Sequence, residues 1–229
     1  MTSAKYNVVE IFDSIEGEGK RSGSLATFIR FAGCNLRCSY CDTSYALFGE
    51  KQPCHFEMLT LDSLLEKVHH YQVTLTGGEP LLQPSICSLI QRLDEAHEIN
   101  IETNGAVDIR PVRNTSPSRH LFFTIDYKLP SSGMEKHMIR DNFENLRKED
   151  VVKFVIGSYD DEIRTSEIAD WLEEYYDKEN MPQIYLGTVN GKWENERIVE
   201  LMKKTPSLNK AHIQLQLHKI IWDENKRGV

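Results

Sequence analysis

Short runs of β-branched, leucine and aromatic residues recur along the chain, and a polar or glycine-containing turn follows most of them. These runs lie at 26–31, 73–76, 99–103, 121–126, 151–156, 183–187 and 212–217. Several are almost continuously apolar, as expected for parallel strands that are covered on both faces. The pattern therefore predicts that these runs are the core strands of a largely parallel sheet.

Between these runs, apolar residues repeat at the spacing of a helix. The repeats are Leu61, Leu64, Leu65, Val68 and Tyr71, then Ile86, Leu89, Ile90 and Leu93, then Ile168, Trp171, Leu172 and Tyr175. Alternating strands and helices indicate a parallel sheet with right-handed crossovers, either an open doubly wound sheet or a full or partial barrel. The preceding stretch 6–12, YNVVEIF, predicts an extra N-terminal strand at the sheet edge.

Residues with reactive side chains follow the predicted strands. A cysteine-rich loop follows 26–31, GGEP (77–80) follows 73–76, and TNG (103–105) follows 99–103. DYK (126–128) and HK (218–219) close two later strands. Because reactive groups gather at the carboxyl ends of parallel strands, this distribution predicts an active site at that end of the sheet.

Length and charge narrow the class of protein. With 229 residues, 40% hydrophobic and 27% charged, the chain is expected to form one domain over 1–229. A net charge of −8 gives no general attraction to nucleic acid or to an anionic membrane, so a small-molecule substrate is favoured. No apolar stretch reaches the roughly 20 residues that span a bilayer, and the N-terminus lacks a signal-peptide core, so we expect a cytoplasmic location.

Three of the five cysteines, Cys34, Cys38 and Cys41, form a C-x3-C-x2-C motif. In a reducing compartment, such a cluster indicates metal binding or catalysis rather than disulfides. A structural zinc site would need a fourth ligand, which Cys54 or His55 would supply. A [4Fe–4S] cluster held by three cysteines instead leaves one iron open for chemistry, and the motif alone allows both sites.

The motif, with Tyr40 before the last cysteine, resembles the signature of radical S-adenosylmethionine (SAM) enzymes, and GGEP resembles a second motif of that superfamily. More narrowly, FDSIEGEG (12–19), FIRFAGCNLRCSYCDT (28–43), LTGGEP, ETNG, DYKLPSSG, QLHKIIW and NKRGV are similar to the 7-carboxy-7-deazaguanine synthase family. The resemblance implies a partial (β/α)6-type TIM barrel with an extra N-terminal strand. It places the cluster loop at 32–48 and the substrate loop at 13–23.

The resemblance also implies an activity. The family converts 6-carboxy-5,6,7,8-tetrahydropterin to 7-carboxy-7-deazaguanine and ammonia, a ring contraction in queuosine and 7-deazapurine biosynthesis. The implied cofactors are a [4Fe–4S] cluster, SAM and Mg²⁺, and a 5′-deoxyadenosyl radical replaces a protein acid or base. The implied partners are an electron donor such as flavodoxin or ferredoxin and a second copy of the chain in a homodimer.

Residue roles follow from the matching motifs. The resemblance assigns the cluster to Cys34, Cys38 and Cys41, Mg²⁺ to Thr43, SAM to Tyr40, Asp42, Gly78, Glu79, Glu102, Asp126 and Lys128, and the substrate to Ile15, Glu16, Gly17, Arg30, Thr76 and His218. A threonine hydroxyl is the hard oxygen ligand that Mg²⁺ prefers. A guanidinium at the end of a strand, as at Arg30, is suited to bind a substrate carboxylate through two hydrogen bonds.

Two other functions use the same cysteine motif. A glycyl-radical activating enzyme shares it but acts on a partner protein, and the SIEGEG loop, Thr43 and QLHK argue against that function. A non-catalytic binding module stabilised by zinc is the second alternative. Iron–sulfur absorption after anaerobic purification distinguishes a cluster from zinc.

Overall fold

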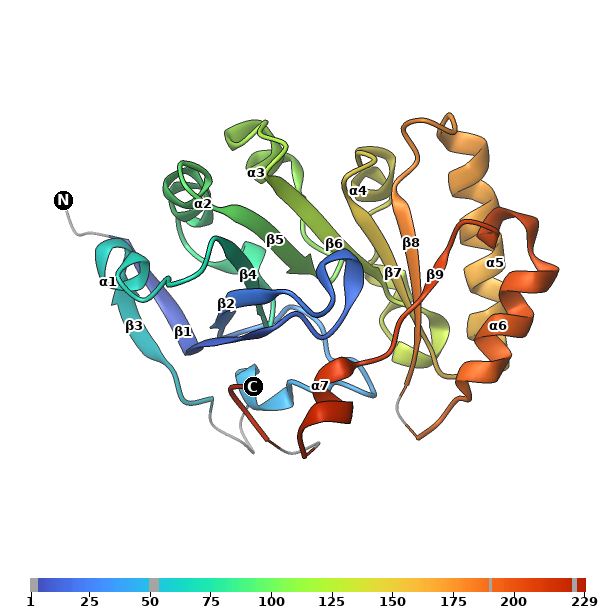
Figure 1. Ribbon diagram of the computed structural model, residues 1–229, viewed down its shortest axis with the longest axis horizontal. Coiled ribbons are helices and arrows are strands. Elements are labelled where there is room, and N and C mark those ends of the chain that lie inside the picture. The colour runs from blue at the N-terminus through green and yellow to red at the C-terminus, as the bar shows by residue number, and fades with distance from the viewer. Residues whose placement is uncertain (1–3, 50–53, 190, 224–225) are drawn as a thin grey trace.

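A curved nine-stranded sheet runs through the computed structural model, which describes residues 4–49, 54–189, 191–223 and 226–229 (Figure 1). The strands are β1 (Lys5–Ile15), β2 (Leu25–Phe31), β3 (Glu57–Thr60), β4 (Gln72–Gly77), β5 (Glu98–Thr103), β6 (Leu121–Tyr127), β7 (Val151–Ile156), β8 (Gln183–Thr188) and β9 (His212–Ile213). Their order across the sheet is β3-β1-β2-β4-β5-β6-β7-β8-β9. Neighbours from β2 to β9 are parallel, whereas β1 is antiparallel to both β2 and β3.

The predicted partial barrel is confirmed. The strands β2, β4, β5, β6, β7 and β8 form its parallel wall, and each contains or overlaps one predicted run. Two details of the prediction are wrong. The N-terminal strand β1 is not at the edge, because β3 pairs outside it. The run 212–217 contributes only the two residues of β9, and the remainder turns away from the sheet into helix α7.

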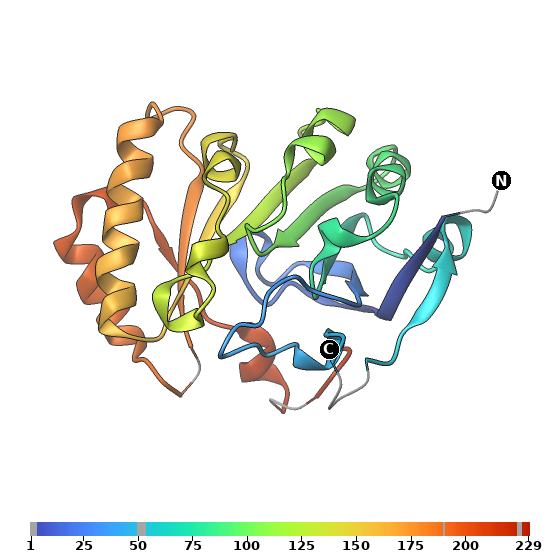
Figure 2. The same ribbon diagram turned by 180° about the vertical axis from the view of Figure 1, so that it is seen from behind.

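Helices cover the outer side of the curved sheet. The helices of the described chain are α1 (Leu61–Leu65), α2 (Ile86–Asp94), α3 (Arg110–Thr115), α4 (Arg140–Glu144), α5 (Tyr159–Tyr175), α6 (Asn195–Lys204) and α7 (Leu217–Ile221). Figures 1 and 2 show α2 to α5 outside the sheet, whereas α7 lies on the opposite side of the molecule, beside the cysteine loop. The predicted apolar face of α2 is buried, but Tyr71 lies beyond the end of α1 and is 59% exposed. No helix in the described part of the chain is long and apolar enough to cross a membrane.

The inner side of the barrel contains buried polar residues, which the apolar runs did not predict. Thr74, Asn100 and Thr124 lie on adjacent strands and are nearly inaccessible to solvent. The segment between β1 and β2 enters this space, and Arg21 donates to the Thr74 hydroxyl at 2.6 Å. Because buried polar groups need hydrogen-bond partners, the barrel interior is filled by a polar loop rather than by apolar side chains alone.

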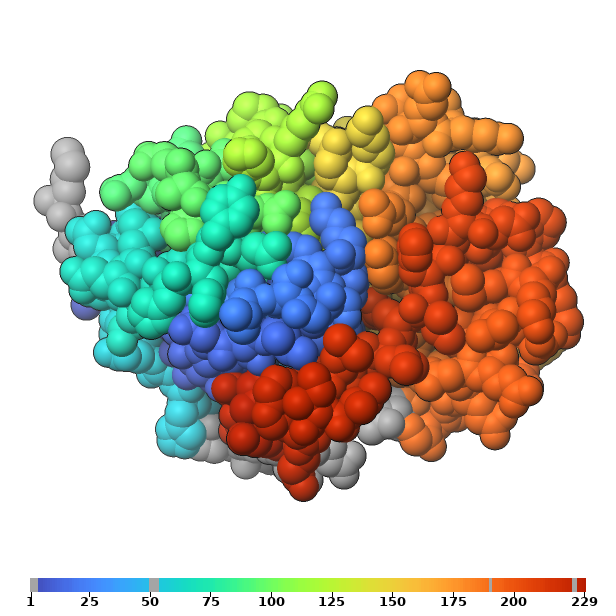
Figure 3. Space-filling model, in the orientation of Figure 1, coloured from blue at the N-terminus to red at the C-terminus, as the bar shows by residue number. Residues whose placement is uncertain are grey.

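The C-terminal segment closes one side of the molecule against the N-terminal hairpin. On the face in Figure 3, the C-terminal residues lie directly against the N-terminal ones. The Leu217 amide donates to the Gly17 carbonyl at 3.0 Å. A Cβ at Gly17 would lie 2.3 Å from Nδ1 of His218, so only glycine permits this contact.

Candidate functional site

A cavity of about 1130 Å³ opens at the carboxyl ends of the parallel strands. Among the residues with a predicted site role, all but Glu79 line it: Ile15, Glu16, Gly17, Arg30, Cys34, Cys38, Tyr40, Cys41, Asp42, Thr43, Thr76, Gly78, Glu102, Asp126, Lys128 and His218. These residues come from seven separate segments between β1 and α7. The fold thus brings motifs that are distant in sequence to one cavity.

The three cysteines of the motif face this cavity as half-buried free thiols. The Leu36 amide and the Asn104 side-chain amide each lie 3.4 Å from Sγ of Cys34. Burial raises the pKa of the Cys38 and Cys41 thiols above the ordinary value. Stable thiolates at these positions therefore require a bound cation, as a metal centre supplies.

The three thiols do not form a ready-made site for a single metal ion. A tetrahedral zinc ion at about 2.3 Å from each sulfur would hold the sulfurs within about 4 Å of one another. Among the described residues, no three cysteine, histidine or carboxylate side chains converge closely enough to hold one metal ion. In a cubane cluster each cysteine binds a different iron, so the thiols lie further apart.

GGEP packs against the start of the cysteine loop. The Gly78 amide donates to Phe31 at 3.0 Å, and a Cβ at Gly78 would lie only 2.0 Å from the Gly33 carbonyl oxygen. Position 78 thus requires glycine, because the cysteine loop passes close to it at Gly33. The lack of a side chain at position 78 therefore lets the cysteine loop pack directly against the end of β4.

Glu79 does not face the cavity, although the sequence predicted a SAM contact. Its carboxylate is fully buried and accepts hydrogen bonds from the Leu81 amide, the Thr103 hydroxyl and the Asn104 amide at 2.8–3.1 Å. Burial raises the pKa of Glu79 to about 7, although these hydrogen bonds favour the ionised form. In this structure Glu79 links the ends of β4 and β5. The side-chain amide of Asn104, whose backbone Glu79 binds, in turn contacts Sγ of Cys34.

Asp126 and Lys128 form an ion pair at the end of β6, with Nζ 2.7 Å from Oδ2. Burial opposes ionisation of both, but each lies beside an opposite charge, so the pKa of Asp126 is lowered and that of Lys128 is raised. The second oxygen of Asp126, Oδ1, is buried without a hydrogen-bond partner. Because Asp126 lines the cavity, this free acceptor fits a ligand with ammonium or hydroxyl donors, such as SAM.

Arg30 faces the cavity from β2 and is held by a carboxylate that the sequence analysis did not identify. Oε1 of Glu10 accepts hydrogen bonds from Nε of Arg30 at 2.7 Å and from the Tyr45 hydroxyl at 3.0 Å. Burial disfavours the charged guanidinium, but Tyr45 and Glu10 outweigh it and raise the pKa of Arg30. Arg30 is thus a fixed cation suited to an anionic ligand group.

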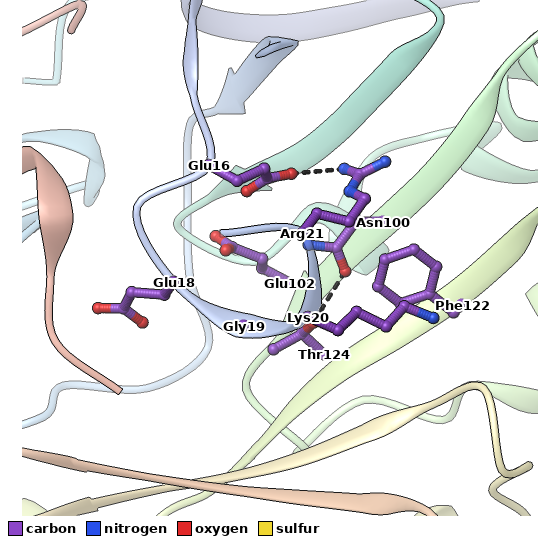
Figure 4. Close-up of a pocket in the computed structure, with 9 residues that line it drawn as sticks. All are labelled: Glu16, Glu18, Gly19, Lys20, Arg21, Asn100, Glu102, Phe122 and Thr124. Atoms are coloured by element: carbon purple, nitrogen blue, oxygen red, sulfur yellow. Dashed lines mark hydrogen bonds and ion pairs between the residues drawn. The ribbon is translucent and has the colours of Figure 1, made fainter. Parts of the chain in front are cut away.

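Glu16 is bound to a buried arginine (Figure 4). Nη2 of Arg21 forms an ion pair with Oε1 of Glu16, and the same oxygen accepts from Thr74. Nearby, Nζ of Lys20 lies 3.3 Å from the centre of the Phe122 ring. The loop between β1 and β2 is therefore anchored inside the barrel by its own basic residues, and this anchoring sets the position of Glu16 at the cavity.

Lys153, Glu18 and Glu102, which line the cavity, belong to a second network of charged residues. Lys153, a single charge within the apolar strand β7, pairs with Glu18, and Glu102 accepts from the Thr76 hydroxyl at 2.6 Å. Burial lowers the pKa of Lys153, but Glu18, Asp126 and Glu102 outweigh it and raise the value overall. Burial raises the pKa of Glu102 to about 7. Glu102 thus lies in the cavity wall beside Thr76, a predicted substrate residue.

The sequence predicted His218 at the end of a strand, but the structure places it in helix α7. Burial lowers the pKa of His218 below its ordinary value, so a neutral imidazole faces the cavity near neutral pH. Among the cavity residues to which the sequence analysis gave no role, Glu18 and Asn104 lie in the quoted motifs FDSIEGEG and TNG, and Lys153 carried a signal as a lone charge in VVKFVI. Glu10, Tyr45 and Arg227 lie in ordinary polar contexts that no short motif marks.

The chain matches the family model of the radical SAM superfamily over residues 28–115. It is 43% identical to a protein named 7-carboxy-7-deazaguanine synthase from Clostridium acetobutylicum, over 98% of this chain and 99% of the relative. A protein of the same name from Chlorobaculum tepidum is 34% identical over 100% of this chain and 99% of the relative. The crystal structure of QueE from Escherichia coli has the same fold, with a TM-score of 0.67, 21% identity, and coverage of 92% of this chain and 94% of that chain.

The partial barrel, the three thiols at its opening and the family match define a radical SAM enzyme, whose cofactors are a [4Fe–4S] cluster and SAM. The cluster has three candidate ligands in Cys34, Cys38 and Cys41, and the free acceptor of Asp126 suits SAM. Within that superfamily, the chain belongs to the 7-carboxy-7-deazaguanine synthase family. Activation of a partner protein and zinc-stabilised binding are not favoured.

Proposed function

We propose that the protein converts 6-carboxy-5,6,7,8-tetrahydropterin to 7-carboxy-7-deazaguanine and ammonia, as a lyase of 7-deazapurine biosynthesis. The observation that carries this proposal is the pairing of Arg30 with the cysteine loop in one cavity, within a chain of this family. A fixed guanidinium gives the cavity a binding group for the substrate carboxylate. Glu16 and the ion pair of Glu18 with Lys153 supply hydrogen-bonding groups for the polar pterin ring.

Held by Cys34, Cys38 and Cys41, the cluster would supply, together with SAM, the radical chemistry that activates a C–H bond of the substrate. The residues of the chain fix positions around that chemistry. Arg30, Thr76 and His218 orient the substrate, and Tyr40, Asp42, Gly78, Glu102, Asp126 and Lys128 form the SAM side. The anchored loop around Glu16 and Gly17 and the helix α7 close the cavity against water, which protects a reactive intermediate.

Mg²⁺ is part of the proposal through Thr43. Its hydroxyl faces the cavity and donates to Oδ1 of Asp42 at 2.8 Å, so a hard oxygen lies beside Cys41. Mg²⁺ prefers oxygen ligands and retains several waters, and a substrate carboxylate completes such a shell. Thr43 would hold such an ion, which would help Arg30 to bind the substrate carboxylate.

The chain is proposed to act as a single radical SAM domain over 1–229, with the cluster loop at 32–48 and the substrate loop at 13–23. It works in the cytoplasm as a homodimer, and a flavodoxin or ferredoxin supplies the electron. A negative net charge of −8 is consistent with a small-molecule enzyme that binds neither nucleic acid nor membrane directly.

An anaerobic assay tests the proposal. Reconstituted enzyme, SAM, a reductant, Mg²⁺ and 6-carboxytetrahydropterin should release 7-carboxy-7-deazaguanine, detected by mass spectrometry. Tetrahydropterin without the carboxylate is the matched control and should give no ring-contracted product, because Arg30 and Mg²⁺ lack their ligand. Cleavage of SAM without any deazaguanine product would reject the proposed substrate.

A further inference from the structure

Asp161, in the first turn of α5, is fully buried and connects two strand ends. Its Oδ1 accepts from the Ser131 amide at 2.9 Å, and Oδ2 accepts from the Gly157 amide at 2.8 Å and from the Ser131 hydroxyl. Ser131 lies in the turn after β6, and Gly157 follows β7. One carboxylate therefore fixes the chain after two adjacent strands.

The turn that Asp161 fixes holds the cysteine loop directly. The Ser39 hydroxyl donates to the Ser131 carbonyl at 2.7 Å, and the Ser39 amide donates to the Ser132 carbonyl at 3.1 Å. Ser39 follows Cys38 and precedes Cys41 by two residues. The part of the loop that carries these two thiols is thus hydrogen-bonded to the residues that Asp161 positions.

The other strand end gives a second, separate connection. The Tyr40 hydroxyl lies 3.4 Å from the Val155 carbonyl in β7, two residues before Gly157. A Cβ at Gly157 would lie 2.8 Å from Val189 and 3.3 Å from the Ser131 hydroxyl, so glycine permits the close packing of this joint. Ser39 and Tyr40, which lie between Cys38 and Cys41, therefore both bind segments that meet at Asp161.

We propose that Asp161 is a positioning residue for the iron–sulfur cluster: through the turn at 130–132 and the end of β7, it holds Cys38 and Cys41 at their places in the cluster loop. The inference rests on the assignment of the cluster to these cysteines. It makes α5, which itself contributes nothing to the cavity wall, a determinant of cluster stability. Hydrogen-bonded partners that orient metal ligands commonly change metal affinity by about 10–100-fold when they are removed.

The test uses the reconstituted holoenzyme and Asp161→Asn. An asparagine of the same shape places an NH₂ group against one of the donors, Ser131 or Gly157, so one contact is lost. We expect the variant to lose its cluster to a chelator about tenfold faster than the parent protein, followed by visible absorption. The electron paramagnetic resonance spectrum of the reduced cluster should also respond to SAM only at higher SAM concentration.

The matched control is Asp160→Asn, the same change at the exposed neighbour in the same helical turn. It should keep the cluster-loss rate and the SAM response of the parent protein. Ser39→Ala, which removes one hydrogen bond at the surface, should accelerate cluster loss in the same direction and less strongly, even if Asp161→Asn folds poorly.

The outcomes separate the two proposals. If Asp161→Asn and Ser39→Ala lower only the thermal stability, and cluster loss and SAM response stay within twofold of the parent, Asp161 has a purely structural role and the inference is wrong. A parent protein that holds no cluster at all would instead reject the proposed function.

Discussion

Glu10 and Arg30 lie opposite each other on the antiparallel strands β1 and β2, and Oε1 of Glu10 is 2.7 Å from Nε of Arg30. A β-bulge between Val8 and Glu10 shifts the register at this point. The contact uses Nε, so Glu10 does not engage the two terminal nitrogens of the guanidinium. Glu10 thus orients Arg30 for a ligand and leaves its terminal nitrogens for that ligand.

Glu10→Gln should raise the KM for the pterin about tenfold with little change in kcat, because a hydrogen bond to a charged group is worth about 1.5–3 kcal/mol. The measurement is initial-rate kinetics under anaerobic conditions. Glu57→Gln, the same change at an exposed position of the neighbouring strand β3, serves as the control and should leave KM unchanged. An equal fall in kcat with constant KM would contradict an orienting role for Glu10.

Cys38→Ala should abolish both the cluster and turnover, since two thiolates do not hold a cubane cluster that three are proposed to bind. Iron content and visible absorption after anaerobic reconstitution measure the loss. Cys87→Ala changes a half-buried thiol on α2, outside the cavity, and should retain iron and activity. Retention of a full cluster in Cys38→Ala would show that a residue other than Cys38 is the third ligand.

Thr43→Ala should keep the cluster and the binding of SAM but slow the pterin reaction and remove its response to Mg²⁺. The reason is that the hydroxyl is the proposed Mg²⁺ ligand, while the three thiols are untouched. A titration of activity against Mg²⁺ measures the effect. Thr43→Ser keeps the hydroxyl and should behave like the parent protein. An unchanged Mg²⁺ response in Thr43→Ala would show that Thr43 does not bind Mg²⁺.

Gly78→Ala should destabilise the protein by about 1–3 kcal/mol or more, because its methyl group would overlap the Gly33 carbonyl. Urea unfolding of the cluster-free protein measures the change. Gly187→Ala provides the comparison, since a Cβ there meets its nearest atom at 3.4 Å, an ordinary contact. Equal stability of the two variants would show that the cysteine loop moves freely away from β4.

The stability of the cluster-free protein should fall as the pH rises from about 4.5 to about 7, because burial raises the pKa of Glu79 from 4.5 to about 7. The folded state binds the proton more tightly than the unfolded state does. The associated stability is therefore complete below pH 4.5 and lost as the pH passes 7. At 1.36 kcal/mol per pKa unit, Glu79 contributes at most about 3 kcal/mol to this change.

Glu79→Gln removes the titrating group and should flatten the pH dependence of the unfolding free energy over the same range. Glu102 is raised to about 7 by burial too, so part of the slope should remain in this variant. The variant should also be less stable below pH 4.5, because an amide NH₂ replaces an acceptor between Thr103 and Asn104. A slope equal to that of the parent would show that Glu79 does not titrate in this window.

The sequence predicted the parts of this fold that local patterns determine. The apolar runs identified the parallel strands, and residues at their carboxyl ends identified the cavity. β3 was missed because EMLT is short and weakly apolar, and its strand pairing depends on β1. Glu79 was assigned to the cavity from its motif, but its orientation is set by donors on β5 that are distant in sequence.

Contacts between distant segments also explain why Glu10 and Asp161 were not predicted. Each acts through another residue, and neither lies in a motif. The position of His218 in α7 escaped prediction because the run HIQLQL continues the pattern of a strand beyond the point where the chain leaves the sheet. A two-residue strand and a short helix leave little periodicity from which to locate that point.

The cysteine loop has almost no regular structure of its own, and residues far along the chain give it its shape. Asn35 donates to Ala106 at 3.1 Å, Ser39 to Ser132 at 3.1 Å, and Glu79 to Gly33 at 2.8 Å. These partners come together only when the first half of the barrel has folded. The shape of the loop is therefore a property of the whole barrel, and the three thiols hold their mutual positions only through segments that lie up to about a hundred residues away in the sequence.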